Sequence, residues 1–247
     1  MRAAFSTSLL AAVACSSSSA APSHQITVAA AASLSQVFQR IGAGFERDHP
    51  GTTVRFTFSS SNGLATQIEQ GAPVDVFASA APKWLDAVAT DPGVIARATF
   101  ARNKLIVIVP RDDPARIGRL ADLGKRGVRL VLAAPGVPAG DYARQALRKA
   151  GLRVALGNVV SNEQDVEGVV AKVTSGDADA GIVYATDLTA SVSSLVRAIE
   201  IPPAVNVVAV YQIGIVRGTK AETAARAFFD YVLGPGQAAL RAAGFAA

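Results

Sequence analysis

The chain has 247 residues, enough for one or two domains with a sizeable core. Half of the residues are hydrophobic but only 6% are aromatic, and this Ala- and Val-rich composition is typical of an α/β protein. The net charge is +5, yet the basic residues are scattered among acidic ones and form no block of five or six, which disfavours a nucleic-acid-binding surface.

The first twenty residues are predicted to be a secretory signal peptide. A short positive start precedes an apolar stretch over residues 3–14, and Ser18 and Ala20 suit cleavage after Ala20. The apolar stretch is too short to span a membrane. The single cysteine, Cys15, lies in this leader, where residues 12–15 weakly resemble a lipoprotein box. We expect export with cleavage near Ala20, and lipid attachment at Cys15 is the less favoured alternative.

Strand and helix patterns alternate along nearly all of the remaining chain. In chain order they predict strand 26–32, helix 34–48, strand 54–58, helix 64–68, strand 74–78, helix 82–88, strands 105–109 and 128–132, helices 142–147 and 166–173, strands 180–184 and 207–216, and helices 221–233 and 237–243. Alternation of this kind predicts parallel sheets with helices on both faces. Ligands bind beyond the carboxyl ends of the strands in such sheets.

Ser33 and Ser61 each lie where a predicted strand passes into a predicted helix. A helix N-terminus presents unpaired N–H groups and a partial positive charge, so it attracts an anion without Lys or Arg. Each serine also has a simpler interpretation. Ser33 begins a capping-box pattern, and residues 59–61 fit a solvated loop before a capped helix. The simpler interpretation is favoured for each serine alone, but two such ends facing one crevice would cradle an oxyanion.

Three positions in the second half of the chain have the same character. Ala139 follows Pro138, which suits the first turn of a helix, and small neighbours leave the backbone amides accessible. Val166 opens a helix with a valine face, and Tyr184 ends a buried strand, where its hydroxyl donates one neutral hydrogen bond. A capped helix, a core valine and a core tyrosine are the respective alternatives, and each is favoured when its position is considered alone.

The residue inventory disfavours catalysis. The only histidines are His24, just after the leader, and His49, in a predicted turn. A Ser-His-Asp triad, a zinc site built on paired histidines and a cysteine nucleophile therefore lack their residues. The chain also has no Gly-x-x-x-x-Gly-Lys-Ser/Thr loop for nucleotide phosphates. We expect a binding protein rather than an enzyme.

An ordered set of short strings covers nearly all of the predicted mature chain. The strings are AAASL at 30–34, SSS at 59–61, QIEQGAPVDVF at 67–77, KWLD at 83–86, VPAGDYA at 137–143, DV at 165–166, GIVY at 181–184 and GF at 244–245. With this set the chain resembles the periplasmic molybdate-binding proteins of ABC importers, within the type II substrate-binding superfamily. Each string is weak alone, whereas the ordered set is highly specific.

The resemblance implies a two-lobed type II periplasmic binding protein. Each lobe would be a mainly parallel sheet flanked by helices, with the ligand in the cleft between the lobes. Lobe 1 would combine residues 25–103 and 211–247, and lobe 2 would span residues 104–210. In the family, two hydroxyls from lobe 1 hold the oxyanion, and two backbone amides and a tyrosine hydroxyl hold it from lobe 2. These donors map to Ser33, Ser61, Ala139, Val166 and Tyr184.

The implied function is capture of molybdate, and of tungstate, for delivery to the membrane permease of an ABC importer with a separate ATPase. The protein is expected to be a periplasmic monomer without a cofactor. Molybdenum would enter only as the bound molybdate anion, with no direct protein–metal ligand. Two alternatives stay open: a binder of sulfate, phosphate or another tetrahedral oxyanion on the same fold, and an oxyanion sensor module without a transport role.

Overall fold

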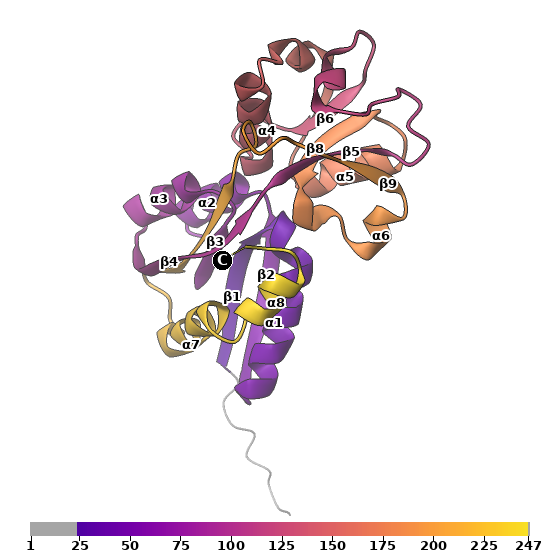
Figure 1. The fold of residues 1–247 in the computed structure, drawn as a ribbon. Coiled ribbons are helices and arrows are strands. Elements are labelled where there is room, and N and C mark those ends of the chain that lie inside the picture. Colours follow the sequence, from indigo (N-terminus) through magenta and orange to yellow (C-terminus); the bar gives the residue numbers. More distant parts are fainter. Residues whose placement is uncertain (1–23, 247) are drawn as a thin grey trace, which may run out of the picture.

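The computed structural model describes residues 24–246, which form two lobes that are each built on a five-stranded sheet (Figure 1). The predicted leader, with Cys15 and the cleavage position after Ala20, lies outside these residues. The strand order is β2-β1-β3-β10-β4 in the first lobe and β7-β6-β8-β5-β9 in the second. The predicted class, a two-lobed α/β fold, is confirmed.

The first lobe contains both ends of the described chain. Its strands are β1 (His24–Ala31), β2 (Thr52–Ser59), β3 (Val76–Ser79), β4 (Val94–Asn103) and β10 (Ala209–Val216). Its helices are η1 (Ala32–Leu34), α1 (Ser35–Asp48), α2 (Ser61–Glu69), α3 (Pro82–Thr90), α7 (Glu222–Leu233) and α8 (Gln237–Ala242).

The second lobe is formed by the middle of the chain. Its strands are β5 (Leu105–Pro110), β6 (Leu130–Ala133), β7 (Val159–Glu163), β8 (Ala180–Tyr184) and β9 (Val196–Glu200). Its helices are α4 (Pro138–Lys149), α5 (Val166–Thr174) and α6 (Ala190–Ser193), with 3₁₀ turns η2 (Leu120–Gly124), η3 (Arg153–Asn158) and η4 (Ala185–Asp187). Among the helices described between residues 24 and 246, none combines the length and the apolar character that a membrane span requires.

Both sheets are mixed, and the reversed strand in each has a clear origin. Strands β2, β1 and β3 are parallel, as are β7, β6 and β8. Strand β10 runs antiparallel to β3 and β4, and β5 runs antiparallel to β8 and β9. Because β5 and β10 are the strands by which the chain enters a lobe from its neighbour, they start at the edge where the other strands end. The carboxyl ends of the parallel strands of both lobes therefore face the junction between the lobes.

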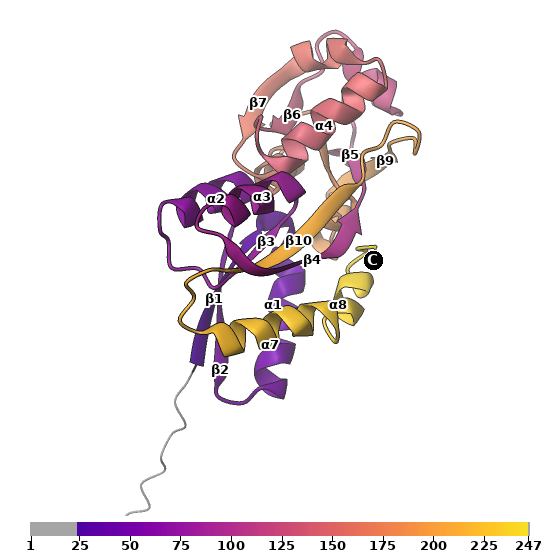
Figure 2. The same cartoon turned by 90° about the vertical axis from the view of Figure 1, so that its left-hand side faces the viewer.

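Two short crossovers join the lobes, and they lie side by side (Figure 2). One runs from the end of β4 to the start of β5 at Leu105, and the other from the end of β9 to the start of β10. The side chain of Asn206 ties them together. Its Oδ1 accepts a hydrogen bond from the Leu105 amide at 3.1 Å, and its Nδ2 donates to the Leu105 carbonyl at 2.8 Å. The junction is thus a pair of adjacent chain segments that link the two lobes.

The interior strand β1 is buried on both faces, so it fixes the position of the residues that follow it. Val28 lies in the hydrophobic layer with α1 and α7, whereas Ala29 lies in the layer with α2 and α3, because successive side chains point to opposite faces of a sheet. Phe45 of α1 packs edge to face on Phe228 of α7 with ring centroids 5.3 Å apart. The chain leaves β1 at the junction between the lobes, directly before Ser33.

Candidate ligand-binding site

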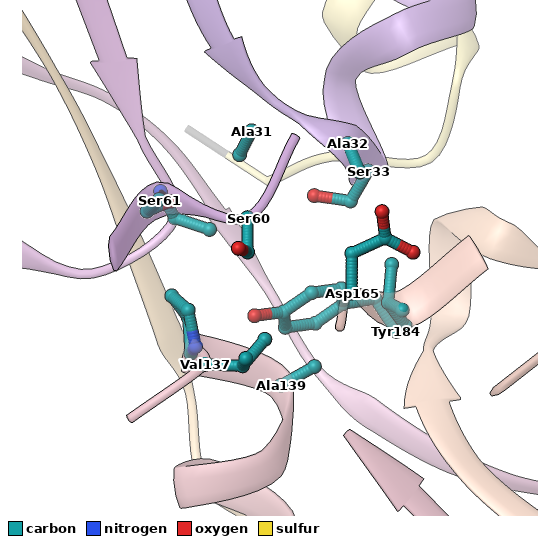
Figure 3. A pocket seen from close by; sticks show the side chains of 12 residues that line it. Ala31, Ala32, Ser33, Ser60, Ser61, Val137, Ala139, Asp165 and Tyr184 are labelled. Carbon is teal, nitrogen blue, oxygen red and sulfur yellow. Dashed lines mark hydrogen bonds between the residues drawn. The ribbon is translucent and has the colours of Figure 1, made fainter. Parts of the chain in front are cut away.

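A small cavity lies between the lobes, at the carboxyl ends of their parallel strands (Figure 3). Lobe 1 lines it with Ala31, Ala32, Ser33, Ser60, Ser61 and Ala80, and lobe 2 with Val137, Pro138, Ala139, Asp165, Val166 and Tyr184. The cavity volume is about 20 Å³, more than one water molecule needs and far too little for a sugar or a peptide. The cavity therefore has room for only a small ligand, and all five residues predicted from the sequence line it.

Ser33 lies in the 3₁₀ turn η1, between β1 and α1, with its hydroxyl pointing into the space between the lobes (Figure 3). Its Oγ lies 2.9 Å from the hydroxyl oxygen of Tyr211. The residue before α1 is Leu34, and no side chain caps that helix, so the capping-box interpretation of Ser33 is wrong. The extra 3₁₀ turn moves Ser33 ahead of the helix and leaves its hydroxyl free of a capping role.

Ser61 is the first residue of α2 and is only 1% exposed. Its Oγ accepts a hydrogen bond from the backbone amide of Ala80 at 3.0 Å, and within the described structure it donates to no protein group. The hydroxyl proton is therefore available to an acceptor in the cavity. The neighbouring Ser60 caps α2 by position without a side-chain hydrogen bond, and its hydroxyl also faces the cavity, a role that the sequence analysis missed.

Lobe 2 contributes the starts of two helices. Ala139 lies in the first turn of α4, after Pro138, and Val166 is the first residue of α5. Backbone N–H groups in the first turn have no carbonyl partner within their own helix, and the helix dipole adds a partial positive charge there. Asp165 caps α5, because its Oδ1 accepts from the Gly168 amide at 3.0 Å. Two sets of unpaired amides therefore lie at the wall of one cavity.

Gly140 explains how α4 reaches this position. A Cβ added to Gly140 would lie 2.2 Å from the Ala133 carbonyl oxygen and 2.4 Å from that of Ala134, both of which are backbone atoms at the end of β6. The guanidinium of Arg144 then donates to the Ala133 carbonyl at 2.6 Å and to the Gly140 carbonyl at 3.0 Å. The start of α4 is thereby held against the end of its strand, which sets the position of the Ala139 amide.

Tyr184 ends β8 and is only 1% exposed, yet within the described structure its hydroxyl has no hydrogen-bond partner. A buried polar group without a partner costs free energy, and such groups are rare in folded proteins. Burial also raises the pKa of Tyr184 well above its ordinary value, so the hydroxyl stays protonated and is a neutral donor. An acceptor placed in the cavity would satisfy it.

The charge near the cavity is negative. None of the residues that line it is basic, and Asp165 adds a carboxylate to the wall. The Oδ2 atom of Asp187, one turn beyond Tyr184, accepts from the Tyr184 amide at 2.8 Å. Burial raises the pKa of Asp187 to about 8, and the carboxylates of Glu167 and Asp165 act in the same direction. The buried Asp187 carboxyl therefore stays largely protonated at neutral pH, and Asp165 is the one acidic side chain among the residues that line the cavity.

Direct contacts between the lobes surround the cavity. Lys83 forms an ion pair with Asp141 of α4, and the adjacent Trp84 donates from Nε1 to the Gly136 carbonyl at 3.0 Å. The Ser35 hydroxyl donates to Glu167 Oε1 at 2.8 Å. These contacts hold the two lobes together in a closed arrangement. Among residues 24–246, no group of three or more His, Cys, Asp or Glu side chains is arranged to hold a metal ion.

These features define a two-lobed binding protein that encloses a small solute. The family described as bacterial extracellular solute-binding protein matches residues 26–246, and the chain belongs to that family. It is 38% identical over 245 residues to the molybdate-binding protein ModA of Mycobacterium tuberculosis. That alignment covers 95% of this chain and 92% of the relative. It is 37% identical over 220 residues to ModA of Escherichia coli, covering 85% and 84%.

Solved structures show the same similarity. The periplasmic molybdate-binding protein of Azotobacter vinelandii superimposes with a TM-score of 0.78 at 25% identity, covering 90% of this chain and 99% of that one. The substrate-binding domain of a putative molybdenum ABC transporter from Clostridium difficile gives a TM-score of 0.69 at 27% identity, covering 90% and 98%. The matched family is one of solute-binding proteins, and the relatives named above are described as molybdate-binding proteins.

Proposed function

We propose that the protein is an extracytoplasmic solute-binding protein that captures molybdate, and also tungstate, between its lobes. The observation that carries the proposal is the convergence of Ser33, Ser61, Ala139, Val166 and Tyr184 on one cavity, with the buried Tyr184 hydroxyl lacking a partner. The molybdate-binding relatives support the choice of ligand. Molybdenum would be held only as the oxyanion, through hydrogen bonds to its oxygens, without a protein–metal bond.

The neutral character of the donors sets the selectivity. Hydroxyls and amides that only donate suit a fully deprotonated dianion whose oxygens only accept. Sulfate has the right charge but is smaller than molybdate, so donors fixed on two lobes cannot all reach it. Each hydrogen bond to a charged group contributes roughly 1.5–3 kcal/mol, so losing one or two weakens binding about tenfold to several hundredfold or more. Tungstate nearly matches molybdate in size and competes with it.

Capture and release follow from closure of the lobes. A ligand that contacts both lobes stabilises the closed form over the open one, because it interacts with both walls only there. We propose that the closed, loaded monomer delivers the anion to the permease of an ABC importer that a separate ATPase drives. Export with cleavage near Ala20 would place it outside the cytoplasmic membrane. A sensor module on this fold would bind the anion without supporting its uptake.

A second candidate rests on one observation, the carboxylate of Asp165 on the cavity wall. Its Oδ1 is held by Gly168, whereas in the described structure Oδ2 has no hydrogen-bond partner. A free carboxylate oxygen can accept the proton of hydrogen phosphate. Asp165→Asn separates the two ligands while it preserves the cap, because Asn and Asp cap helices equally well. Loss of the charge should strengthen molybdate binding if molybdate is the ligand, and should weaken phosphate binding if phosphate is.

Ligand-induced stabilisation tests the proposed function. A ligand that binds only the folded protein stabilises it by about 4 kcal/mol when its free concentration is a thousandfold above Kd. Millimolar molybdate should therefore raise Tm clearly, and small-angle scattering should show a more compact particle than the ligand-free protein. The absence of a Tm change with either molybdate or tungstate would contradict the proposal.

Intact-mass measurement of the protein from the cell envelope checks the processing near Ala20.

A further inference from the structure

Tyr211 lies at the junction of the lobes without lining the cavity. It belongs to β10, where it pairs with Ala101 of β4, and its side chain is 0% exposed. Its ring is in edge contact with the rings of Phe245 and Phe100, at centroid distances of 5.4 and 6.2 Å. A fully buried ring with aromatic neighbours on more than one side has little freedom to rotate, so its hydroxyl occupies a defined position.

This hydroxyl touches one proposed ligand donor, and the ring touches another. Tyr211 Oη lies 2.9 Å from Ser33 Oγ of lobe 1. The Tyr211 ring packs against the Tyr184 ring of lobe 2 with centroids 5.8 Å apart and an interplanar angle of 63°. Tyr211 therefore lies between a donor of each lobe, behind the surface that a ligand would contact.

The chemistry of the bound state fixes the direction of the Ser33–Tyr211 hydrogen bond. Each hydroxyl has one proton, and in the ligand-free protein either oxygen can donate to the other. A dianion that only accepts needs the Ser33 proton for itself. Ser33 Oγ must then accept from Tyr211, whose pKa burial raises, so that its proton is retained. The result is a chain of donors from Tyr211 to Ser33 to the anion, in which each bond polarises the next.

We infer that Tyr211 is a positioning residue for oxyanion binding: by donating to Ser33 Oγ it orients the Ser33 proton toward the cavity. The inference rests on the proposed function. Without the Tyr211 hydroxyl, the Ser33 hydroxyl is free to rotate, and its oxygen loses a buried partner. The cost falls on ligand binding, because the aromatic contacts of the ring do not involve its hydroxyl.

The variant Tyr211→Phe tests the inference, since it removes the hydroxyl and keeps the ring. We expect it to weaken molybdate binding about tenfold by calorimetry. In a Ser33→Ala background the same change should weaken binding less than about twofold, because the residue through which Tyr211 acts is gone. Tyr231→Phe is the matched control. It removes a hydroxyl of the same lobe that donates to Asp48 at 3.0 Å, far from the cavity lining, and should leave affinity unchanged.

The outcomes separate the inference from the proposed function. If the wild-type protein binds neither molybdate nor tungstate, the proposed function fails. If the wild type binds molybdate and Tyr211→Phe binds it equally well, or loses the same factor with and without Ser33, the role of Tyr211 is overturned. A measurement on the wild type needs no variant: NMR of tyrosine-labelled protein should show the Tyr211 hydroxyl proton moving downfield on molybdate binding. An unmoved resonance would contradict the inference.

Discussion

The two lobes line the same cavity with different kinds of donor. Lobe 1 presents side-chain hydroxyls, those of Ser33, Ser60 and Ser61. Lobe 2 presents the amides of two helix starts, at Ala139 and Val166, and adds one hydroxyl. A hydroxyl is deleted by a substitution to alanine, whereas a backbone amide is kept by every residue except proline. Residue identity therefore matters directly for the lobe 1 donors and for Tyr184, whereas for the two helix starts of lobe 2 it matters through backbone position.

Gly140→Ala should have the largest effect, because the added Cβ clashes with backbone atoms of lobe 2. The added Cβ would lie 2.2 Å from the Ala133 carbonyl oxygen, a contact that no side-chain rotation relieves. We expect the free energy of unfolding to fall by about 1–3 kcal/mol or more, and molybdate binding to weaken more than tenfold as the Ala139 amide moves. Thermal melting and calorimetry measure both. Gly157→Ala, with open space around the new Cβ, is the control, and equal behaviour of the two variants would refute the expectation.

Val166→Pro should have the next largest effect, because it deletes an amide donor by substitution. Val166 is the first residue of α5, where proline fits well. Asp165 before it has an extended backbone, φ −153° and ψ −177°, outside the helical region that a following proline disfavours. Removal of one hydrogen bond to a charged ligand should weaken binding at least about tenfold. Val166→Ala keeps the amide and should keep the affinity. Calorimetry in which the proline variant binds as well as the alanine variant would exclude this amide from the site.

Ser33→Ala and Ser61→Ala test the hydroxyl donors of lobe 1. Each removes one hydroxyl and should weaken molybdate binding by about tenfold or somewhat more. Ser175→Ala is the control, since its Oγ donates to the Lys172 carbonyl at the other end of α5. Equilibrium titration gives the ratio of Kd values. Full affinity in both site variants would mean that lobe 1 does not contribute these hydroxyls.

The effect with the least consequence for ligand binding is a pH dependence of stability that arises beside Tyr184. The folded-state pKa of Asp187 is about 8, far above its ordinary value of 3.8, so between pH 4 and 8 the folded state binds more protons than the unfolded state. The free energy of unfolding that depends on Asp187 should therefore fall as pH rises through this window and level off above pH 8. Asp187→Asn keeps an acceptor for the Tyr184 amide and should flatten the Tm profile from pH 5 to 9. A variant profile as steep as that of the wild type would contradict the assignment.

The buried strands of the fold were predictable from sequence, whereas three of the four edge strands were not. Strands β5 and β8 are apolar along their whole length and were predicted within one residue. Strands β4, β7 and β9 were missed because they lie at the sheet edges or carry exposed polar residues, such as Arg97 and Arg197. The reversed direction of β5 and β10 was also not predicted, because it depends on which lobe the chain enters and not on any local pattern.

The candidate site was also predicted only in part. Helix starts and strand ends marked the five lining positions as candidates, and the family resemblance selected them as ligand donors. Ser60 and the carboxylate of Asp165 were missed as cavity-lining groups. A run of three serines does not reveal which side chains face the crevice, and an N-cap aspartate has the same sequence pattern whether or not its second oxygen faces a ligand. No sequence pattern identifies Tyr211 as a positioning residue, because its contacts are with residues that are distant in sequence.

The most direct test of the central claim is a calorimetric titration of the purified protein with molybdate, tungstate, sulfate and phosphate in turn. Neutral donors from two lobes around a small cavity predict that molybdate and tungstate bind with similar Kd values. Sulfate should bind at least about tenfold more weakly, and phosphate should be rejected. Sulfate or phosphate bound as tightly as molybdate would contradict the account.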